Sequence, residues 1–277
     1  MPSIYGDLER PPLHVEALRR ALVVPDAMWT EVEVVDESPS TNRALVERAR
    51  KDPGSGFVLL AEHQTAGRGR LDRTWTTPPR AGITMSVLVR PDRVEAGRWP
   101  WLPLLAGLAV AAAVRKETLV PVELKWPNDV IVADRKLAGL LVERVESPGM
   151  SPAAVIGVGI NVSTAQDELP VPTATSLRLE GAHTTDRTVL VKAVLRTLGG
   201  LLDSWQRDGG DPSRGLHTAY LDACTTIGRD VEVHLPTGET ATGQASGVDD
   251  HGRLLVRTPA GQRAFGAGDV VHVRPAT

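Results

Sequence analysis

The pattern of the sequence changes near residues 224–228, and this change does most to constrain the fold. Before it, helical and strand patterns are mixed along the chain. After it, residues 228–275 carry five short alternating segments separated by turn residues. Five short strands in about fifty residues are typical of a small closed β-barrel. We therefore expect a main domain over residues 1–225 and a barrel over residues 226–277.

The main domain is predicted to be one mixed β-sheet with helices packed on it. Its strand and helix patterns do not alternate as a regular βαβ repeat, so we expect the α+β class. Strand patterns lie at 31–35, 57–62, 82–90, 122–126, 130–133, 137–146 and 153–162. Helical patterns lie at 13–23, 41–51, 101–117, 190–206 and 215–223.

Composition excludes several classes of protein. A chain with 42% hydrophobic and 23% charged residues is not disordered. The net charge of −3 argues against binding DNA through bulk charge. The single cysteine, Cys224, forms no internal disulfide and predicts a cytoplasmic, reducing setting. The N-terminus carries no secretory signal, and the apolar stretch at 99–114 is shorter than the ~20 residues of a membrane span, so no membrane association is expected.

Three segments carry residues suited to chemistry, and the first is a loop at 64–75 rich in glycine and arginine. Arg68, Arg70 and Arg73 bring three guanidinium groups together, which suits phosphate or carboxylate oxygens. The segment is not a P-loop, because it lacks the Gly-Lys-Ser/Thr ending and no clear helix follows. A solvated basic turn explains the residue types equally well.

The second segment places Lys125 and Asp129 on either side of a Trp-Pro step, and Lys136 opens the next strand. The lysines suit anionic oxygens, and Asp129 with Asn128 suits Mg²⁺. Two surface turns with exposed lysines are the simpler explanation of these residues. Trp126 fits that explanation poorly, because a large ring rarely lies in a turn without packing or stacking.

The third segment, residues 157–162, has two glycines within an apolar strand pattern. It is not a dinucleotide fingerprint, because Val162 stands where the last glycine is required. Asn161 lies at the strand end, where it suits a purine edge or, alternatively, a turn. The sequence has no G-x-S-x-G, no H-E-x-x-H and no cysteine pair.

Taken together and in this order, these segments resemble the biotin protein ligases. The resemblance runs through Ser40-Thr41-Asn42, the 64–70 loop, Lys-Trp-Pro-Asn-Asp at 125–129, Lys-Leu-Ala-Gly at 136–139 and Gly-Val-Gly-Ile-Asn at 157–161. It covers about residues 30–275. It implies a class II synthetase-like catalytic domain followed by an SH3-like β-barrel.

The resemblance implies a two-step reaction that uses biotin, ATP and Mg²⁺. Biotin and MgATP give biotinyl-5′-adenylate and pyrophosphate. The adenylate then acylates a lysine on the biotin carboxyl carrier domain of an acyl-CoA or pyruvate carboxylase. Fixed cations must offset the repulsion between the carboxylate and the triphosphate, and a closing loop would keep water from the adenylate. We expect a monomer or a weak homodimer.

The resemblance also implies roles for individual residues. The expected biotin-binding residues are Ser40, Thr41, Gln64, Gly67, Arg68, Trp75, Lys136 and Gly139. The expected ATP-binding residues are Arg70, Arg73, Lys125, Asn128, Asp129 and Asn161, with Asp129 also a candidate Mg²⁺ ligand. The expected catalytic residues are Lys136, Arg68 and Arg70.

Three other functions remain open from the sequence. A lipoyl or octanoyl transferase has a related fold, but the Gly-Arg-Gly-Arg and Lys-Trp-Pro-Asn-Asp pairing argues against it. A DNA-bound regulator that senses biotinyl-adenylate is disfavoured, because the roughly 35 residues before Ser40 are too few for a DNA-reading module. The C-terminal barrel could also act as an independent interaction module.

Overall fold

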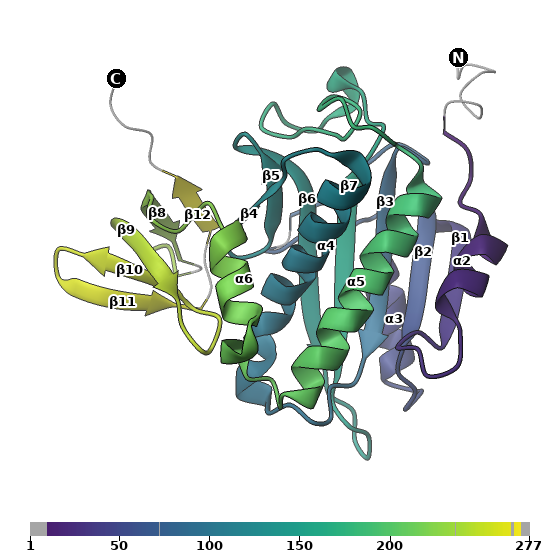
Figure 1. Cartoon of the computed structure of the whole chain (residues 1–277), viewed down its shortest axis with the longest axis horizontal. Coiled ribbons are helices and arrows are strands. Elements are labelled where there is room, and N and C mark those ends of the chain that lie inside the picture. Colours follow the sequence, from purple (N-terminus) through teal and green to yellow (C-terminus); the bar gives the residue numbers. More distant parts are fainter. Residues whose placement is uncertain (1–9, 72, 236, 267–268, 273–277) are drawn as a thin grey trace.

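The computed structural model describes residues 10–71, 73–235, 237–266 and 269–272 of the 277. A large part built of helices on one sheet adjoins a smaller β part formed by the C-terminal strands (Figure 1). The expectation of a missing secretory signal concerns residues 1–9, and the last predicted strand reaches 275. Both extend outside the described residues.

A seven-stranded sheet with the order β1-β2-β3-β7-β6-β5-β4 forms the centre of the larger part. Its strands are β1 (Glu31–Ser38), β2 (Phe57–Gln64), β3 (Gly82–Val89), β4 (Glu123–Lys125), β5 (Asp129–Val132), β6 (Arg135–Val145) and β7 (Ala153–Asn161). Strands β1 and β2 are parallel and the other neighbours antiparallel, so the predicted mixed sheet is confirmed. Every residue of β3 and β7 is buried, which explains their nearly continuous apolar sequences.

Helices cover both faces of this sheet (Figure 1). One face carries α4 (Leu102–Thr118) and α5 (Arg187–Arg207), with α6 (Leu216–Ala223) beside α4. The other face carries α3 (Thr41–Ala49), which begins at Ser40, whose side chain accepts a hydrogen bond from the Arg43 backbone. Helix α2 (Val15–Leu22) contacts β1 and α5. The short 3₁₀ helices η1 (Ala96–Trp101), η2 (Gln166–Glu168) and η3 (Pro212–Arg214) were not predicted.

The main apolar helix is longer than its sequence pattern predicted. Together η1 and α4 make a helical segment of 23 residues, Ala96–Thr118, which is long and apolar enough to cross a membrane. Its most apolar window is 72% buried inside the protein. The apolar character of this segment is therefore that of a central core helix.

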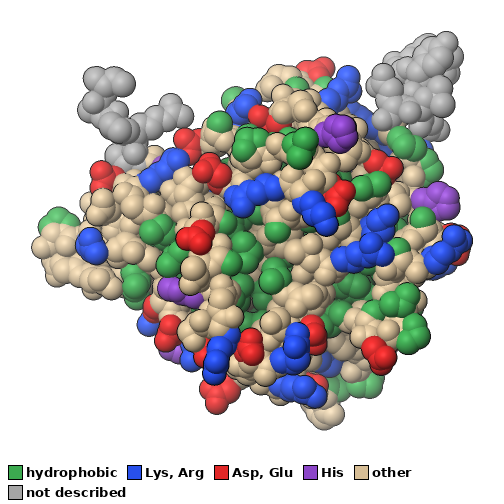
Figure 2. All heavy atoms as spheres, viewed as in Figure 1, with side chains coloured by type: hydrophobic (Ala, Val, Ile, Leu, Met, Phe, Trp, Pro, Cys, Tyr) green, Lys and Arg blue, Asp and Glu red, His purple; other side chains and the backbone are tan. Residues whose placement is uncertain are grey.

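The face formed by α4 and α5 shows no concentration of one charge. Lysine and arginine side chains alternate with aspartate and glutamate across it, and hydrophobic side chains are scattered between them (Figure 2). This mixture agrees with the small net charge of −3. A face of this kind offers no bulk electrostatic attraction to a polyanion.

The C-terminal strands form a second sheet with the order β11-β10-β9-β8-β12. They are β8 (Asp230–His234), β9 (Thr240–Val248), β10 (Leu254–Thr258), β11 (Gly261–Phe265) and β12 (Asp269–His272). All neighbours are antiparallel, and the five predicted short strands are confirmed. Among the described residues, β11 and β12 form the two edges of the sheet.

One hydrophobic core runs across both parts of the chain. Trp101 and Trp126 belong to the same buried cluster as Val231 of β8. The indole Nε1 of Trp126 donates to the Gly252 carbonyl oxygen at 3.1 Å, and that of Trp101 donates to the Asp250 carbonyl oxygen at 2.9 Å. Trp126, which fitted a surface turn poorly, is therefore explained by its burial between the two parts of the chain. The domain boundary at 225–226 stays a prediction.

Candidate active site

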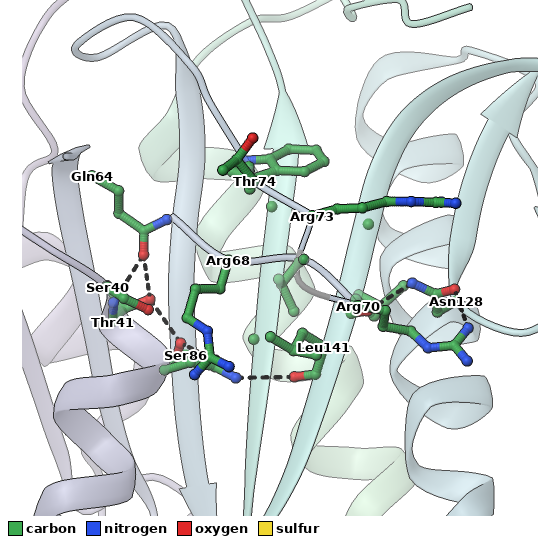
Figure 3. A pocket seen from close by; sticks show the side chains of 18 of the residues that line it. Ser40, Thr41, Gln64, Arg68, Arg70, Arg73, Thr74, Ser86, Asn128 and Leu141 are labelled. Carbon is green, nitrogen blue, oxygen red and sulfur yellow. Dashed lines mark hydrogen bonds between the residues drawn. The ribbon is translucent and has the colours of Figure 1, made fainter. Parts of the chain in front are cut away.

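A cavity of about 120 Å³ lies over β3, β6 and β7, between α3 and the segment 64–75, which we call the arginine loop (Figure 3). The arginine loop folds back on itself, because the Gly69 N–H donates to the Arg73 carbonyl oxygen at 2.7 Å. Most of the expected site residues line this cavity: Ser40, Thr41, Gln64, Arg68, Arg70, Arg73, Trp75, Asn128, Asp129, Lys136 and Gly139. The structure thus brings together segments that are far apart in the sequence.

One end of the cavity carries uncharged polar side chains joined in a hydrogen-bonded chain (Figure 3). The Gln64 Oε1 accepts from the Thr41 backbone N–H at 2.8 Å and from the Thr41 hydroxyl at 3.0 Å. The Thr41 and Ser86 hydroxyl oxygens are 2.7 Å apart, and Ser86 donates to the Asn42 Oδ1 at 2.6 Å. Fixed hydroxyl and amide groups of this kind suit a ligand with both N–H donors and a carbonyl acceptor.

The other end of the cavity is charged. The β5–β6 hairpin brings Lys136 Nζ to 2.7 Å from the Asp129 Oδ1. Arg70 Nη1 donates to the Asn128 Oδ1 at 3.0 Å. Burial lowers the pKa of the Arg70 guanidinium, while the nearby Asp269 and Asp129 carboxylates act in the opposite direction. An incoming anion would meet two cations that are already oriented, Lys136 by a carboxylate and Arg70 by a neutral amide oxygen.

Glycines form the floor of the cavity beneath the indole of Trp75. A Cβ atom at Gly159 would lie 2.4 Å from the Trp75 Cε2, and one at Gly139 would lie 3.3 Å from its Cζ3. A Cβ at Gly157 would lie 2.2 Å from the Asn42 Oδ1. The two glycines of β7 therefore allow close packing of side chains on the sheet. The Trp75 Nε1 is buried, and within the described part of the chain it has no hydrogen-bond partner.

Two of the expected site residues, Gly67 and Lys125, lie outside the cavity lining. Gly67 supports the arginine loop, since its carbonyl accepts from the Trp75 N–H at 2.9 Å and a Cβ there would lie 2.3 Å from the Trp75 carbonyl oxygen. Lys125 is opposite Asp129 in the β4–β5 pairing. Burial lowers the pKa of the Lys125 ammonium group.

Asn161 also lies outside the cavity lining, and its expected contact with a purine stays a prediction. Its side chain is buried, and its Nδ2 donates to the Thr175 carbonyl oxygen at 2.9 Å. In this arrangement Asn161 anchors the loop that follows β7. The sequence did not show this, because Thr175 lies in a segment without any strand or helix pattern.

Three residues at the site were missed by sequence reasoning. Ser86 is fully buried in β3, and a hydroxyl in a strand of mostly apolar residues is a signal that could have found it, although Thr84 of the same strand carries one too. Glu143 of β6 accepts from Asn42 at 2.9 Å and from Arg68 at 3.5 Å. Asp269 reaches the cavity from β12 of the second sheet, and nothing in the sequence marks it.

A magnesium ion fits this site only with help from a ligand. Among the residues that the structure describes, no group of three or more His, Cys, Asp or Glu side chains is placed to hold a metal ion. Both polar atoms of the Asn128 side chain are engaged, since its Nδ2 donates to the Leu140 carbonyl oxygen at 2.9 Å. Asp129 remains as a carboxylate, and one carboxylate plus nucleotide phosphates is a common arrangement for Mg²⁺.

Comparison with known families defines the class of protein first. Residues 34–161 match the model described as the Biotin/lipoate A/B protein ligase family. Residues 226–273 match the biotin protein ligase C terminal domain. A chain with both matches is an enzyme of the biotin/lipoate ligase class that also carries the C-terminal domain of the biotin branch.

The relatives place the chain within that class. It is 41% identical over 272 residues to the biotin–[acetyl-CoA-carboxylase] ligase of Mycobacterium tuberculosis, covering 97% of this chain and 98% of that protein. It is 33% identical to the bifunctional ligase/repressor BirA of Escherichia coli, covering 81% of this chain and 68% of that protein. The chain belongs to the biotin protein ligase family.

A solved structure supports the same assignment. The biotin protein ligase of Aquifex aeolicus, in complex with biotin and ATP, aligns with a TM-score of 0.72 at 29% sequence identity. The alignment covers 89% of this chain and all of that one. The predicted class II synthetase-like fold with a small C-terminal β domain is therefore confirmed.

Proposed function

We propose that this chain activates biotin with ATP and transfers the biotinyl group to a lysine of a biotin carboxyl carrier domain. The observation that carries the proposal is the order of groups along one cavity. Uncharged donors and acceptors at Thr41, Gln64 and Ser86 lie at one end, and the cations Lys136 and Arg70 lie at the other. Biotin has the same order, with a ureido ring at one end and a carboxylate at the other.

In this proposal the uncharged end holds the ureido ring. The hydroxyls of Ser40 and Thr41 and the amide of Gln64 supply donors and acceptors, and hydrogen bonds between Thr41 and Gln64 fix the orientation of those two side chains. The Trp75 indole and the glycine floor at Gly139 enclose the apolar part of the ligand. The Trp75 Nε1 is a buried donor without a partner among the described residues, so a ligand that displaced this indole would allow the N–H to form a hydrogen bond.

The cationic end then promotes activation. A biotin carboxylate oxygen attacks the α-phosphorus of ATP, the bond from that phosphorus to the bridging oxygen breaks, and pyrophosphate leaves. Lys136 turns from Asp129 toward the carboxylate and the α-phosphoryl oxygens, where its charge stabilises the transition state. Arg68, Arg70 and Arg73 hold the remaining phosphate charge. Mg²⁺, held by the ATP phosphates and Asp129, would offset further phosphate charge.

Transfer completes the reaction. The amine of the carrier lysine attacks the acyl carbon of biotinyl-adenylate, an amide forms, and AMP leaves with the anhydride oxygen. Until the carrier arrives, the arginine loop must keep water from the mixed anhydride. This role is supported by Arg68, Arg70 and Arg73 of the loop, which line the cavity, and by the contact of Arg73 with Asp269 of β12.

We further propose that the carrier belongs to a carboxylase, as the name of the Mycobacterium tuberculosis relative suggests. The net charge of −3 supports a chain that acts without DNA. The one cysteine, Cys224, is a buried free thiol, in keeping with the cytoplasm. A monomer or a weak homodimer stays our expectation.

Intact-mass measurement of a carrier domain tests the function directly. Incubation with this protein, biotin and MgATP is expected to add one biotinyl group to the carrier. Parallel reactions with octanoate or lipoate in place of biotin test the related transferase function. A carrier that stays unmodified with biotin, or that gains an octanoyl or lipoyl group at the same rate, would contradict the proposal.

A further inference from the structure

The loop that follows β7, residues 162–175 and hereafter the β7 loop, borders the site through the backbone of Lys136. The Lys136 N–H donates to the Thr173 carbonyl oxygen at 2.7 Å. The Thr175 N–H donates back to the Lys136 carbonyl oxygen at 2.9 Å. Lys136 therefore has its main chain fixed by the β7 loop, while its side chain reaches the cavity.

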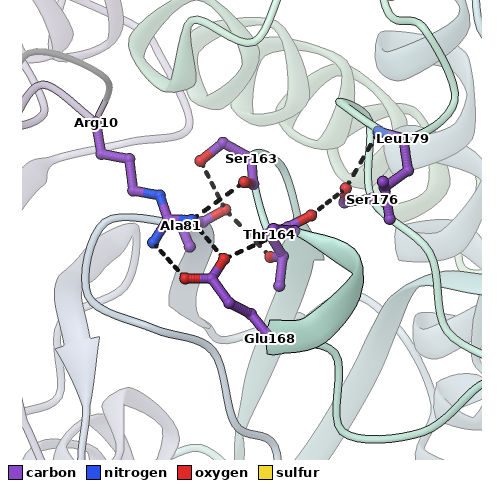
Figure 4. Close-up of polar contacts among 8 residues, drawn as sticks. Arg10, Ala81, Ser163, Thr164, Glu168, Ser176 and Leu179 are labelled. Carbon is purple, nitrogen blue, oxygen red and sulfur yellow. Dashed lines mark hydrogen bonds and ion pairs between the residues drawn. The ribbon is translucent and has the colours of Figure 1, made fainter. Parts of the chain in front are cut away.

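A different residue, Arg10, holds the other side of the β7 loop (Figure 4). Its Nη1 and Nη2 donate to the two carboxylate oxygens of Glu168 at 3.1 and 2.5 Å. Its Nη2 also donates to the Ser163 carbonyl oxygen at 3.3 Å. The two side chains are only 18% and 30% exposed, so solvent screens their attraction incompletely. One guanidinium thus joins the start of the β7 loop to η2.

Arg10 is presented by a segment that is itself anchored. Arg187 Nη2 donates to the Pro11 carbonyl oxygen at 2.6 Å. Arg187 Nη1 is 2.5 Å from a carboxylate oxygen of Glu62, and the other carboxylate oxygen accepts from the Leu13 N–H at 2.6 Å. Arg187 and Glu62 are both buried. This buried ion pair ties the segment that carries Arg10 to β2 and α5.

We propose that Arg10 is a positioning residue for biotin activation, acting through the β7 loop on Lys136. This inference rests on the proposed function. The ion pair with Glu168 fixes one side of the loop, and the loop fixes the Lys136 backbone, so that Nζ lies 2.7 Å from Asp129 at the cationic end. Without Arg10 the loop has more conformations, and Lys136 spends less time in its reactive position.

Replacement of Arg10 separates activation from biotin binding. Arg10→Ala is expected to slow adenylate formation about three- to tenfold, because a bidentate, charge-assisted pair is lost at a loop that must stay ordered. The Kd for biotin measured without ATP should change by less than about twofold, since the uncharged end does not contact the loop. Arg10→Lys should recover part of the rate, because it keeps the charge without the two-pronged contact.

A second substitution tests the partner. Glu168→Gln keeps an oxygen for its hydrogen bond from the Ala165 N–H, which is 2.8 Å long, but removes the charge that Arg10 contacts. It should slow adenylate formation as Arg10→Ala does. The double variant should be no slower than either single variant, because both remove the same interaction. Hydrogen exchange across 163–175 should rise in all three variants.

The matched control is Arg48→Ala, which removes a bidentate ion pair with Glu31 of β1, 2.7 Å at its shorter contact and away from the β7 loop. It should lower the Tm and leave the rate of adenylate formation unchanged. A wild-type protein that forms no adenylate would contradict the proposed function. A wild-type protein that forms it, with Arg10→Ala equally fast or slowed only as much as Arg48→Ala, would overturn the positioning role alone.

Discussion

Replacement of Lys136 by alanine is expected to slow adenylate formation far more than it weakens biotin binding. In the structure Lys136 Nζ lies at the cationic end of the cavity, 2.7 Å from Asp129 and away from the uncharged end that would hold the ureido ring. Losing one fixed cation from such a transition state costs on the order of 3 kcal/mol, about a hundredfold in rate. Biotin binding in the absence of ATP retains the contacts of the uncharged end.

The ion pair with Asp129 makes this prediction sharper. Lys136→Ala removes the cation and also leaves a carboxylate facing the substrate phosphates. At a part-exposed site that added repulsion is roughly 1 kcal/mol after screening, about fivefold in rate. The double variant Lys136→Ala/Asp129→Asn loses this repulsion but also the carboxylate proposed to hold Mg²⁺, so at a Mg²⁺ concentration that saturates the variant it should be about fivefold faster than the single variant. Lys136→Arg should recover the rate only in part, because the planar, delocalised guanidinium group does not replace a compact ammonium group.

Pre-steady-state release of pyrophosphate measures the rate of activation, and isothermal titration with biotin measures binding. The role of Lys136 is refuted if the alanine variant releases pyrophosphate at the wild-type rate. It is also refuted if biotin affinity falls as much as the rate does, because Lys136 would then serve ground-state binding. A double variant as slow as the single one would show that the Asp129 charge does not act on the phosphates.

Three further outcomes are expected. Arg70→Gly should leak adenylate, because a lost charge-assisted contact costs about 1.5–3 kcal/mol and speeds release about ten- to a hundredfold; serum albumin that stays unlabelled in a biotin blot, while adenylate forms, would disprove this. Ser86→Ala leaves the buried Asn42 Oδ1 without its donor and should lower the free energy of unfolding by about 1–3 kcal/mol in urea denaturation; an unchanged unfolding free energy would contradict this. Arginine partners lower the pKa of Glu31 and Glu168 below the ordinary value of 4.5, so the stability they contribute is present above that pH and is lost as the pH falls through the lowered pKa values. Urea unfolding between pH 7 and pH 3 should show a smaller loss for Glu168→Gln than for the wild type.

Local periodicity was enough to predict most of the fold. Strands β3 and β7 were readable because burial of every residue requires a continuous apolar sequence, and α3 because Ser40 is a good cap. The helix η1 was not predicted, because Pro100 and its two tryptophan neighbours carry no helical periodicity. Its place is set by tertiary contacts, such as the bond from Trp101 to Asp250 in the second part of the chain.

The residues of the site likewise fall into those that the sequence indicated and those that only tertiary packing brings to the site. Residues on the arginine loop and the β5–β6 hairpin were expected at the site from the resemblance, because their residue types alone fit solvated surface turns at least as well. Asp269 could not be placed at the site, because the packing of the two sheets brings it there, and for Ser86 the sequence offered a buried hydroxyl but not the strand register that puts it beside Thr41. Asn161 shows the opposite case, in which a residue in a recognisable segment lies outside the cavity lining and its side chain holds a loop.

The second sheet therefore contributes to the lining of the site, and nothing in the sequence marked the residue through which it does so. Asp269 of β12 contacts Arg73 at the end of the arginine loop and lines the same cavity as Lys136. The sheet is held against the main domain by the buried indoles of Trp101 and Trp126. Asp269 thus joins the C-terminal sheet to the arginine loop through an ion pair, and the two indoles join the same sheet to the main domain through the shared core.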